Sequence, residues 1–245
     1  MLKHLRLNAF ALHLLAMACM LCDHLWATLV PGSAWMTCVG RLAFPIFAFL
    51  IAEGARHTRS LRRYALRLFL TALATEIPFD LMYGSTVFYP FHQNVLWTFL
   101  LAIGCIAVIE RVKKRGVLWQ TALAGALTAA VGWALGTLLM VDYFGFGVLT
   151  VLVFYVFRGR RWYDLAGQLA CLFYLHAVAA GGLCYPVSLL GLTLELPQQG
   201  LALLALVPIW LYSGERGPYS RGIRLAWYGF YPAHMAVLCA LRAAL

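Results

Sequence analysis

The sequence predicts an all-α, polytopic bundle of transmembrane helices, and three observations carry this prediction. Of the 245 residues, 63% are hydrophobic and only 11% are charged, whereas a soluble domain has about 25% charged residues. The mean hydropathy is +0.81. Apolar runs close to the spanning length of about 20 residues recur from end to end. No hydrophilic stretch is long enough for a separate domain, so we expect one membrane domain over residues 1–245.

The apolar runs give about nine spans, within bounds of eight and ten. The first run follows Lys3 and Arg6 like a signal peptide, but it is too long and contains Asp23 and His24, so we expect a mature helix. The segment 184–199 is compatible with a loop, a re-entrant segment or a tenth span. The predicted spans are 7–29, 34–54, 62–83, 92–110, 117–139, 143–157, 163–181, 200–213 and 225–243.

The distribution of basic residues predicts the orientation. The chain has 19 Lys and Arg against 9 Asp and Glu, a net charge of +10, and nearly all of the basic residues lie in every second connection. Because cytoplasmic loops are rich in Lys and Arg, the N-terminus is predicted in the cytoplasm and the C-terminus outside. A tenth span would move the Arg216–Arg224 loop outside, which counts against it. The positive charge therefore reports topology and no nucleic-acid partner.

Ionisable side chains inside the spans are costly and mark functional sites. On the predicted topology they share the outer half of the membrane, although they come from different helices. Asp23 points about 100° away from His24 on one helix, so its expected partner is Arg41 or another helix. The residues at this level are Asp23, His24, Arg41, Glu76, Asp80, His92, Gln93, Asn94 and His176, and His234 lies close to the middle of the membrane.

The inner side carries mainly cations. Arg63 and Arg67 share a helix face at a separation of four residues, and their repulsion favours anionic lipid head groups or a phosphorylated ligand. The whole set is Arg56, Arg59, Arg62, Arg63 and Arg67. The seven cysteines lie mostly inside spans as packing residues. Cys19 and Cys22 form a C-x-x-C without a second ligand pair, so no metal is expected.

Several motifs resemble the TraX family in the same order, from about residue 10 to 110 and again near 225–240. They are Cys22-Asp23-His24, the run from Gly40-Arg41 to Glu53-Gly54, Arg56-His57-Thr58-Arg59, Glu76-Ile-Pro-Phe-Asp80, His92-Gln93-Asn94 and Tyr231-Pro232-Ala-His234. TraX proteins are associated with acetylation of the N-terminus of F-type conjugative pilin. The family also resembles the transmembrane acyltransferases, such as the lysosomal heparan glucosaminide acetyltransferases, which use cytosolic acetyl-CoA for an acceptor across the membrane.

The resemblance implies an acetyl-CoA-dependent acyltransferase whose acceptor is an amine or hydroxyl of a peptide, sugar or lipid, a pilin N-terminus among them. His24 is the expected general base, and His92 is the alternative base or acyl-enzyme nucleophile. Asp23 and Arg41 are expected to form a positioning ion pair. Asn94 or Gln93 would donate to the oxyanion, Glu76 and Asp80 would hold an ammonium acceptor, and His234 would contact substrate. The five inner arginines would bind the CoA phosphates.

Two other functions compete. Intramembrane Asp, His and Arg also build ion pathways, which suits a proton-coupled transporter or carrier, although the halves of the chain show no duplication of the kind many transporters have. A structural or accessory membrane subunit is the third reading, and it leaves the ionisable residues of the outer half unexplained.

Overall fold

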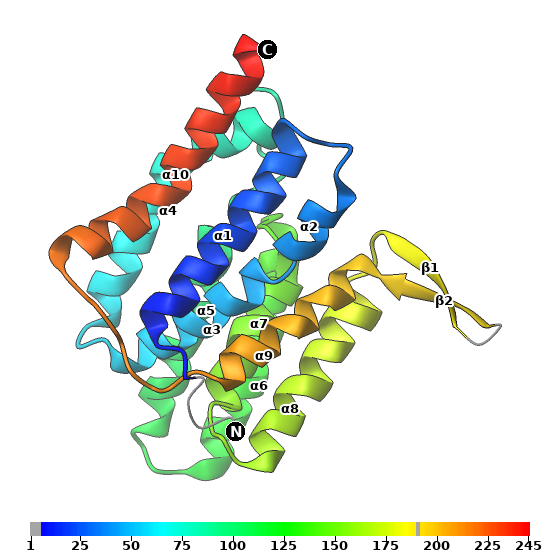
Figure 1. Cartoon of the computed structure of the whole chain (residues 1–245). Coiled ribbons are helices and arrows are strands. Elements are labelled where there is room, and N and C mark those ends of the chain that lie inside the picture. Colours follow the sequence, from blue (N-terminus) through cyan, green and yellow to red (C-terminus); the bar gives the residue numbers. More distant parts are fainter. Residues whose placement is uncertain (1–5, 190–191) are drawn as a thin grey trace. The chain divides into compact units, whose positions relative to one another are not determined.

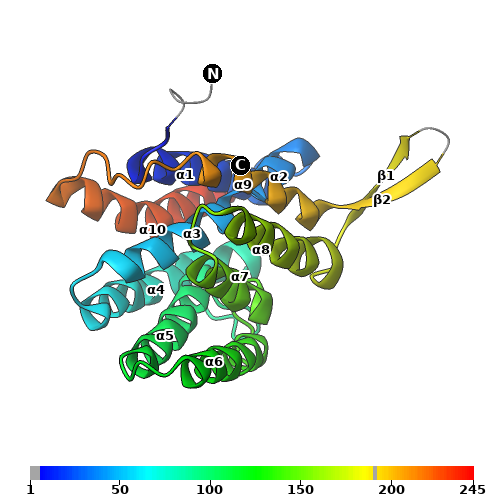
Figure 2. The same ribbon diagram turned by 90° about the horizontal axis from the view of Figure 1, so that it is seen from below.

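A computed structural model describes residues 6–189 and 192–245 (Figures 1 and 2). The protein is nearly all-α, and each of the nine predicted spans is helical. The elements are α1(Ala9–Thr28), α2(Ala34–Gly40), α3(Ala43–His57), α4(Leu61–Tyr83), α5(Val95–Lys113), α6(Leu118–Leu138), α7(Phe144–Val156), α8(Trp162–Leu172), η2(Phe173–Ala179), β1(Cys184–Leu189), β2(Leu192–Pro197), η3(Gln198–Ala205), α9(Leu206–Trp210) and α10(Arg221–Ala244).

The helices have the character of membrane spans. Among the described residues, four helical segments are long and apolar enough to cross a bilayer: Ala9–Thr28, Ala34–His57, Val95–Lys113 and Leu118–Leu138. The membrane class predicted from composition is therefore confirmed. The number of spans and the orientation of the N-terminus stay predictions.

The chain folds into two compact units, and each is assembled from separate stretches of sequence. Unit 1 comprises Met1–Phe47 and Phe157–Tyr219, and unit 2 comprises Ala48–Val156 and Ser220–Leu245. The change from one unit to the other falls inside α3, whose first turn belongs to unit 1.

In unit 1, most of the described part of the segment 184–199 is strand, so the segment does not form the tenth spanning helix. β1 and β2 form an antiparallel hairpin in which Cys184 lies opposite Pro197, visible as the yellow strands in Figure 1. Pro186 and Pro197 lack the amide hydrogen that a helix interior requires, and this disfavours a continuous helix here. β2 leads directly into η3, so the hairpin is tied to the helix that carries Gln198 and Gln199.

The second predicted span, 34–54, is interrupted, which corrects the prediction of one continuous helix. α2 ends at Gly40 and α3 begins at Ala43, so Arg41 lies at the break. The cause is Pro45, because a proline ring clashes with the carbonyl four residues earlier, here that of Arg41, and provides no hydrogen bond to it. Arg41 is thus presented at a helix end.

In unit 2, helices α6 and α7 approach closely through glycines. A Cβ atom added to Gly145 would lie 2.3 Å from the carbonyl oxygen of Trp133, and one added to Gly136 would lie 2.8 Å from the carbonyl oxygen of Phe144. Small residues allow such backbone contacts between membrane helices. This contact fixes the start of α7 and the loop before it.

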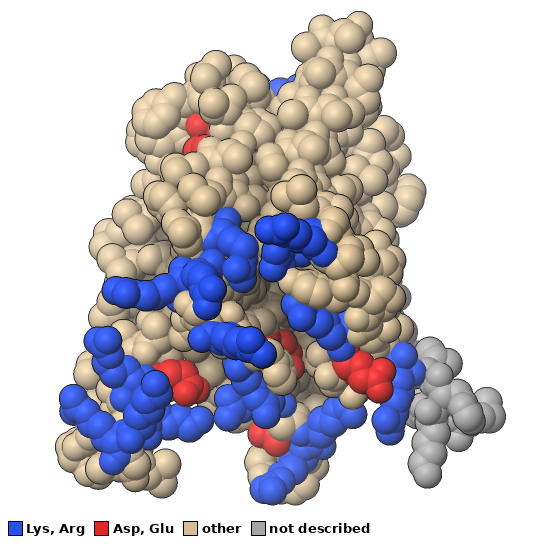
Figure 3. All heavy atoms as spheres, turned by 90° about the vertical axis from the view of Figure 1, so that its left-hand side faces the viewer, with Lys and Arg blue, Asp and Glu red and all other residues tan. Residues whose placement is uncertain are grey.

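Also in unit 2, α4 and α10 pack side by side and parallel (Figure 1). Three hydrogen bonds join residues that are each 161 positions apart: Arg67 Nε to Tyr228 Oη, Cys239 Sγ to the Pro78 carbonyl, and Arg242 Nη2 to the Leu81 carbonyl. Arg242 therefore caps the last turn of α4. Figure 3 shows a face to which these helices contribute: most of it is uncharged, and Lys and Arg gather in one part of it.

Candidate functional site

The ionisable residues predicted at one depth fall into two clusters, each inside one unit. The Arg41 cluster of unit 1 consists of Asp23, Thr37, Arg41, His176 and Gln199. The His92 cluster of unit 2 consists of Glu76, Asp80, His92, Asn94, Trp97 and Asp142.

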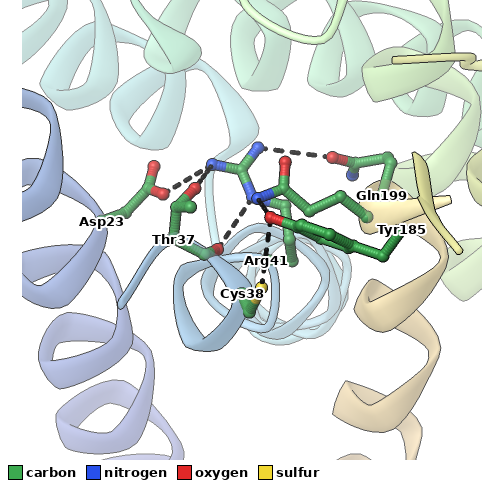
Figure 4. Close-up of polar contacts among 7 residues, drawn as sticks. Asp23, Thr37, Cys38, Arg41, Tyr185 and Gln199 are labelled. Carbon is green, nitrogen blue, oxygen red and sulfur yellow. Dashed lines mark hydrogen bonds and ion pairs between the residues drawn. The ribbon is translucent and has the colours of Figure 1, made fainter. Parts of the chain in front are cut away.

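Arg41 is the centre of the first cluster (Figure 4). Its Nη2 donates to Asp23 Oδ1 at 2.6 Å, which confirms the predicted ion pair, and to Thr37 Oγ1 at 3.1 Å. Its Nε donates to the Thr37 carbonyl at 3.2 Å, and its Nη1 donates to Gln199 Oε1 at 3.4 Å. Gly40 makes the pair possible, because a Cβ there would lie 2.4 Å from that of Asp23. The guanidinium is therefore held by α1, α2 and η3 together.

The same contacts fix the orientation of Gln199 and the tautomer of His176. Arginine can only donate hydrogen bonds, so the side-chain oxygen of Gln199 must face Arg41. The amide nitrogen of Gln199 then donates to His176 Nδ1, which lies 3.0 Å away. Because Nδ1 accepts this bond, neutral His176 carries its proton on Nε2.

His176 is 1% exposed and sits in η2, a π-helical segment. Its ring lies against Phe44, with 6.2 Å between ring centres. Single-turn π-helices frequently occur at functional sites. The sequence singled out His176 but assigned it no role, and Thr37 and Gln199 were missed because neutral side chains give no charge signal.

His24 lies on the buried side of α1 with an exposed fraction of 6%. Its backbone carbonyl accepts a bond from Thr28 Oγ1 at 2.6 Å. The neighbouring Asp23 is engaged with Arg41 and not with His24, as their angular separation on the helix predicted. The part of His24 in catalysis stays a prediction.

His92 precedes α5, outside the helix, and has a carboxylate partner. Its Nε2 lies 3.3 Å from Asp142 Oδ1, and the rings of Phe79 and Tyr83 meet it edge-on with ring centres 5.0 and 5.7 Å away. Burial of the ring opposes its charged form, but the hydrogen bond to Asp142 and the charges of Asp142, Glu76 and Asp80 outweigh burial and raise the pKa of His92. The ring is thus oriented by an acid and two aromatic side chains.

Asp142 was missed by sequence reasoning, although it is the only acid in the predicted outer turn 140–143. The backbone brings it to His92, because Gln93 N–H donates to the Met140 carbonyl and Asp142 N–H donates to the Gln93 carbonyl. Met140, Tyr143 and Phe144 have φ of 51°, 60° and 49°. Non-glycine residues in this left-handed region are strained, and such strain clusters at functional sites.

Glu76 and Asp80 lie on one face of α4, and each has one carboxylate oxygen without a partner in the part of the protein that the structure describes. Glu76 Oε2 accepts from Trp97 Nε1 at 2.8 Å and from Asn94 Nδ2, and Asp80 Oδ2 accepts from the Tyr89 amide at 2.8 Å. Glu76 Oε1 and Asp80 Oδ1 are buried and have no hydrogen-bond partner among the described residues. Such oxygens are costly unless a ligand or water satisfies them.

Asn94, Gln93 and His234, the other predicted site residues of unit 2, differ in the hydrogen bonds that their side chains make. Asn94 caps α5 through Oδ1, while its amide donates to the Ala72 carbonyl and to Glu76, so both of its N–H groups are used. Gln93 donates one bond, to the Pro90 carbonyl at 2.9 Å. His234 Nδ1 bonds to the Phe230 carbonyl of its own helix at 2.6 Å, whereas Tyr231 interacts electrostatically with Asp142 and Glu76.

The five predicted inner arginines all lie in unit 2, around the connection between α3 and α4. Arg56 is in the last turn of α3, Arg59 is in the connection, and Arg62, Arg63 and Arg67 are in the first two turns of α4. For metal binding, no group of three His, Cys, Asp or Glu side chains within residues 6–189 and 192–245 is placed to hold an ion.

Comparison with known proteins now identifies the family. The family model described as TraX protein matches residues 9–242. The chain belongs to the TraX family. A similar protein is the probable fimbrial assembly protein FimC, serogroup H1, of Dichelobacter nodosus, which is 28% identical over 255 residues, covering 99% of this chain and 98% of the relative. No solved structure matches.

The TraX motifs are divided between the two units. The Cys22-Asp23-His24 motif and the Gly40-Arg41 start of the second motif belong to unit 1, where they build the Arg41 cluster, and the Glu53-Gly54 end of the second motif belongs to unit 2. The Glu76 to Asp80 and His92-Gln93-Asn94 motifs belong to unit 2, where they build the His92 cluster, with Tyr231 of the late motif close to it. In this TraX protein the motifs thus mark two polar centres within largely apolar helices.

Proposed function

We propose that this TraX protein is a membrane-bound acyltransferase. It moves an acetyl or other acyl group from cytosolic acetyl-CoA to an amine or hydroxyl acceptor at the outer side of the bacterial inner membrane. The observation that carries the proposal is the His92 cluster, in which a histidine oriented by Asp142 accompanies two carboxylates, each with one buried oxygen that has no hydrogen-bond partner in the described part of the chain. The fimbrial assembly name of the relative supports a peptide acceptor such as a pilin N-terminus.

His92 is the general base that the geometry favours. With Nε2 directed at Asp142, the nitrogen left for the acceptor is Nδ1. An acceptor amine attacks the thioester carbonyl, and His92 takes the proton from the amine nitrogen. The carbon–sulfur bond then breaks, and protonated His92 returns this proton to the CoA sulfur, which leaves as the thiol. His24, which is more buried, is the second candidate base.

The acceptor ammonium would bind to Glu76 and Asp80 before it loses its proton. A cation there satisfies Glu76 Oε1 and Asp80 Oδ1, and an α-amine has a pKa of about 7.7–8.0, so a neutral fraction is available near pH 7. The oxyanion donor is Gln93, since one N–H of its amide remains after the bond to Pro90, whereas the N–H groups of Asn94 hold Ala72 and Glu76. His234 completes the proposed acceptor contacts.

Transfer of radiolabelled acetyl groups from acetyl-CoA to a synthetic peptide, in proteoliposomes that hold the purified protein, tests the proposal. We expect turnover by the wild type and a loss of about 10²- to 10⁴-fold in His92→Gln, the typical contribution of a general base. His24→Gln separates the two candidate bases. Arg115→Ala, in an exposed connection, is the control. Wild-type protein that neither binds CoA nor transfers acetyl groups would refute the acyltransferase.

A transporter is the second candidate, because the buried carboxylate oxygens of Glu76 and Asp80, which have no partner among the described residues, also suit a cation pathway. Proteoliposomes distinguish the two functions. Flux of a cationic substrate in the absence of acyl donor, abolished by Asp80→Asn, would support the transporter.

A further inference from the structure

The parallel packing of α4 and α10 in unit 2 brings the beginnings of the two helices to the same end. The separation of 161 positions in their contacts places Arg224 level with Arg63, and Arg221 level with Ser60, the residue that caps α4. Both helices begin with a serine cap, since Ser60 Oγ accepts from the Arg63 amide and Ser220 Oγ accepts from the Ile223 amide. The partial positive charges at the N-termini of the two helices therefore add at the same place.

Arg67 is the deepest cation in this region. It lies six residues into α4, about 9 Å along the helix axis from Leu61, and is half-buried. Its guanidinium lies 5.7 Å from the ring centre of Tyr64, and its Nε is 3.4 Å from Tyr228 Oη. In the described part of the chain, no carboxylate comes within ion-pairing distance of it. A cation held by two tyrosines and no acid fits an anion from outside the chain.

The neighbouring charges strengthen this conclusion. The first ten residues of α4 and the first ten of α10 contain no Asp or Glu, whereas they contribute five arginines: Arg62, Arg63, Arg67, Arg221 and Arg224. Like charges on adjacent turns repel, and a multivalent anion offsets that repulsion. Figure 3 shows the gathering of basic side chains on a face that includes these helices.

We infer that the paired beginnings of α4 and α10 bind the phosphate groups of the acyl donor, and that Arg221 and Arg224 belong to that site. The inference rests on the proposed acyltransferase function and adds a second helix to the arginines around α3 and α4. A coenzyme A nucleotide carries a diphosphate and a phosphomonoester, about four negative charges near pH 7. Five arginines match this anion, and guanidinium groups bind phosphates in a two-pronged manner.

Phosphate groups reach the inner side of a membrane from two sources, soluble nucleotides and anionic lipid head groups. Our assignment is the nucleotide. The deep position of Arg67 between Tyr64 and Tyr228 suits a ligand that enters between helices, whereas the loop arginines suit a lipid surface.

Equilibrium binding of CoA to full-length protein in nanodiscs tests the inference. Nanodiscs of phosphatidylcholine alone are compared with nanodiscs containing phosphatidylglycerol, and adenosine 3′,5′-bisphosphate serves as competitor. We expect Arg221→Ala and Arg224→Ala each to raise the CoA dissociation constant about 10-fold, the size of one charge-assisted hydrogen bond. Arg224→Lys should recover part of the affinity. The matched control, Arg115→Ala, should change it less than about 2-fold.

The outcomes separate the inference from the proposed function. CoA binding by the wild type that both α10 variants leave unchanged would overturn the inference and leave the acyltransferase standing. Effects of the variants on phosphatidylglycerol binding alone would assign the site to lipid and also overturn it. Wild-type protein that binds no CoA in either nanodisc would overturn both. Thermal unfolding of each variant verifies that the fold is retained.

Discussion

At the scale of single residues, the structure identifies the partners of charged and polar side chains that the sequence singles out. Arg41 and His92 illustrate the two cases. The sequence predicted Asp23 as a partner of Arg41, because a charge inside a span requires another, and the 2.6 Å ion pair confirms it. It did not predict Asp142 as the partner of His92, because 50 residues separate them and only the strained loop at 140–144 brings them together.

Replacement of Asp142 by Asn should change the pH dependence of acyl transfer. Asp142 raises the pKa of His92 through a hydrogen bond and its charge, and the base must be neutral to accept a proton. Wild-type activity should therefore rise with pH through the raised pKa, and Asp142→Asn should move this acidic limb to lower pH. Initial rates measured across the pH range check the shift. An acidic limb that stays at the wild-type pH would show that Asp142 does not set the pKa of the catalytic base.

The contact between His92 and Asp142 should also make the stability of the fold depend on pH. Because the pKa of His92 is raised in the folded protein, protonated His92 stabilises the fold below the unfolded pKa, and this contribution is lost as pH rises through the folded pKa. The thermal stability of the wild type should therefore decrease as pH rises through the folded pKa of His92, and this decrease should be smaller in Asp142→Asn. A variant with an undiminished dependence would show that other groups cause it.

The tautomer of His176 is a third prediction at this scale. In the wild type, the Nδ1 signal of ¹⁵N-labelled His176 should be that of an unprotonated acceptor, because Gln199 donates to it. In Gln199→Glu, the carboxylate can only accept, so Nδ1 should become protonated. Gln198→Glu is the matched control, since Gln198 bonds to Tyr185 and not to His176. A protonated wild-type Nδ1 would contradict the orientation deduced from Arg41.

At the scale of elements, hydropathy predicted which segments are helical but not how they are interrupted or paired. Every predicted span is helical, yet the second breaks at Arg41 and the segment 184–199 forms a hairpin. Prolines cause or favour both departures. The parallel pairing of α4 and α10 was not predicted, because their register depends on contacts between side chains, which hydropathy does not contain.

The contact between α6 and α7 should fail when Gly145 gains a side chain. In Gly145→Ala the new Cβ would overlap the Trp133 backbone, which lies 2.3 Å from its ideal position. Overpacking of this kind costs about 1–3 kcal/mol. Gly125→Ala in α6 is the matched control: nothing lies within 4 Å of its added Cβ, and alanine is favoured over glycine in a helix by about 1 kcal/mol. In thermal unfolding measured in detergent, the midpoint should be lower than that of the wild type for Gly145→Ala and higher for Gly125→Ala.

At the scale of the whole molecule, the sequence predicted the structural class and the family. It did not predict how the ionisable residues are divided between the two units. The depth argument placed Asp23, Glu76 and His92 at one level of the membrane. The structure assigns them to two clusters in separate units, each with a histidine that hydrogen-bonds a polar side chain. Single-sequence reasoning lacks this division because each unit joins stretches far apart in the chain.

Topology is the prediction that belongs to the whole molecule, and the hairpin provides its test. The connection 182–199 contains no Lys or Arg, so the positive-inside rule places it outside, and Cys184 in that hairpin is exposed. A variant that keeps only Cys184 should react with a membrane-impermeant maleimide added to intact spheroplasts. A cysteine-free protein with Arg115→Cys should react only after permeabilisation, because its basic connection is predicted inside. Reaction of both before permeabilisation, or the reverse order, would refute the orientation on which an outer acceptor and an inner donor depend.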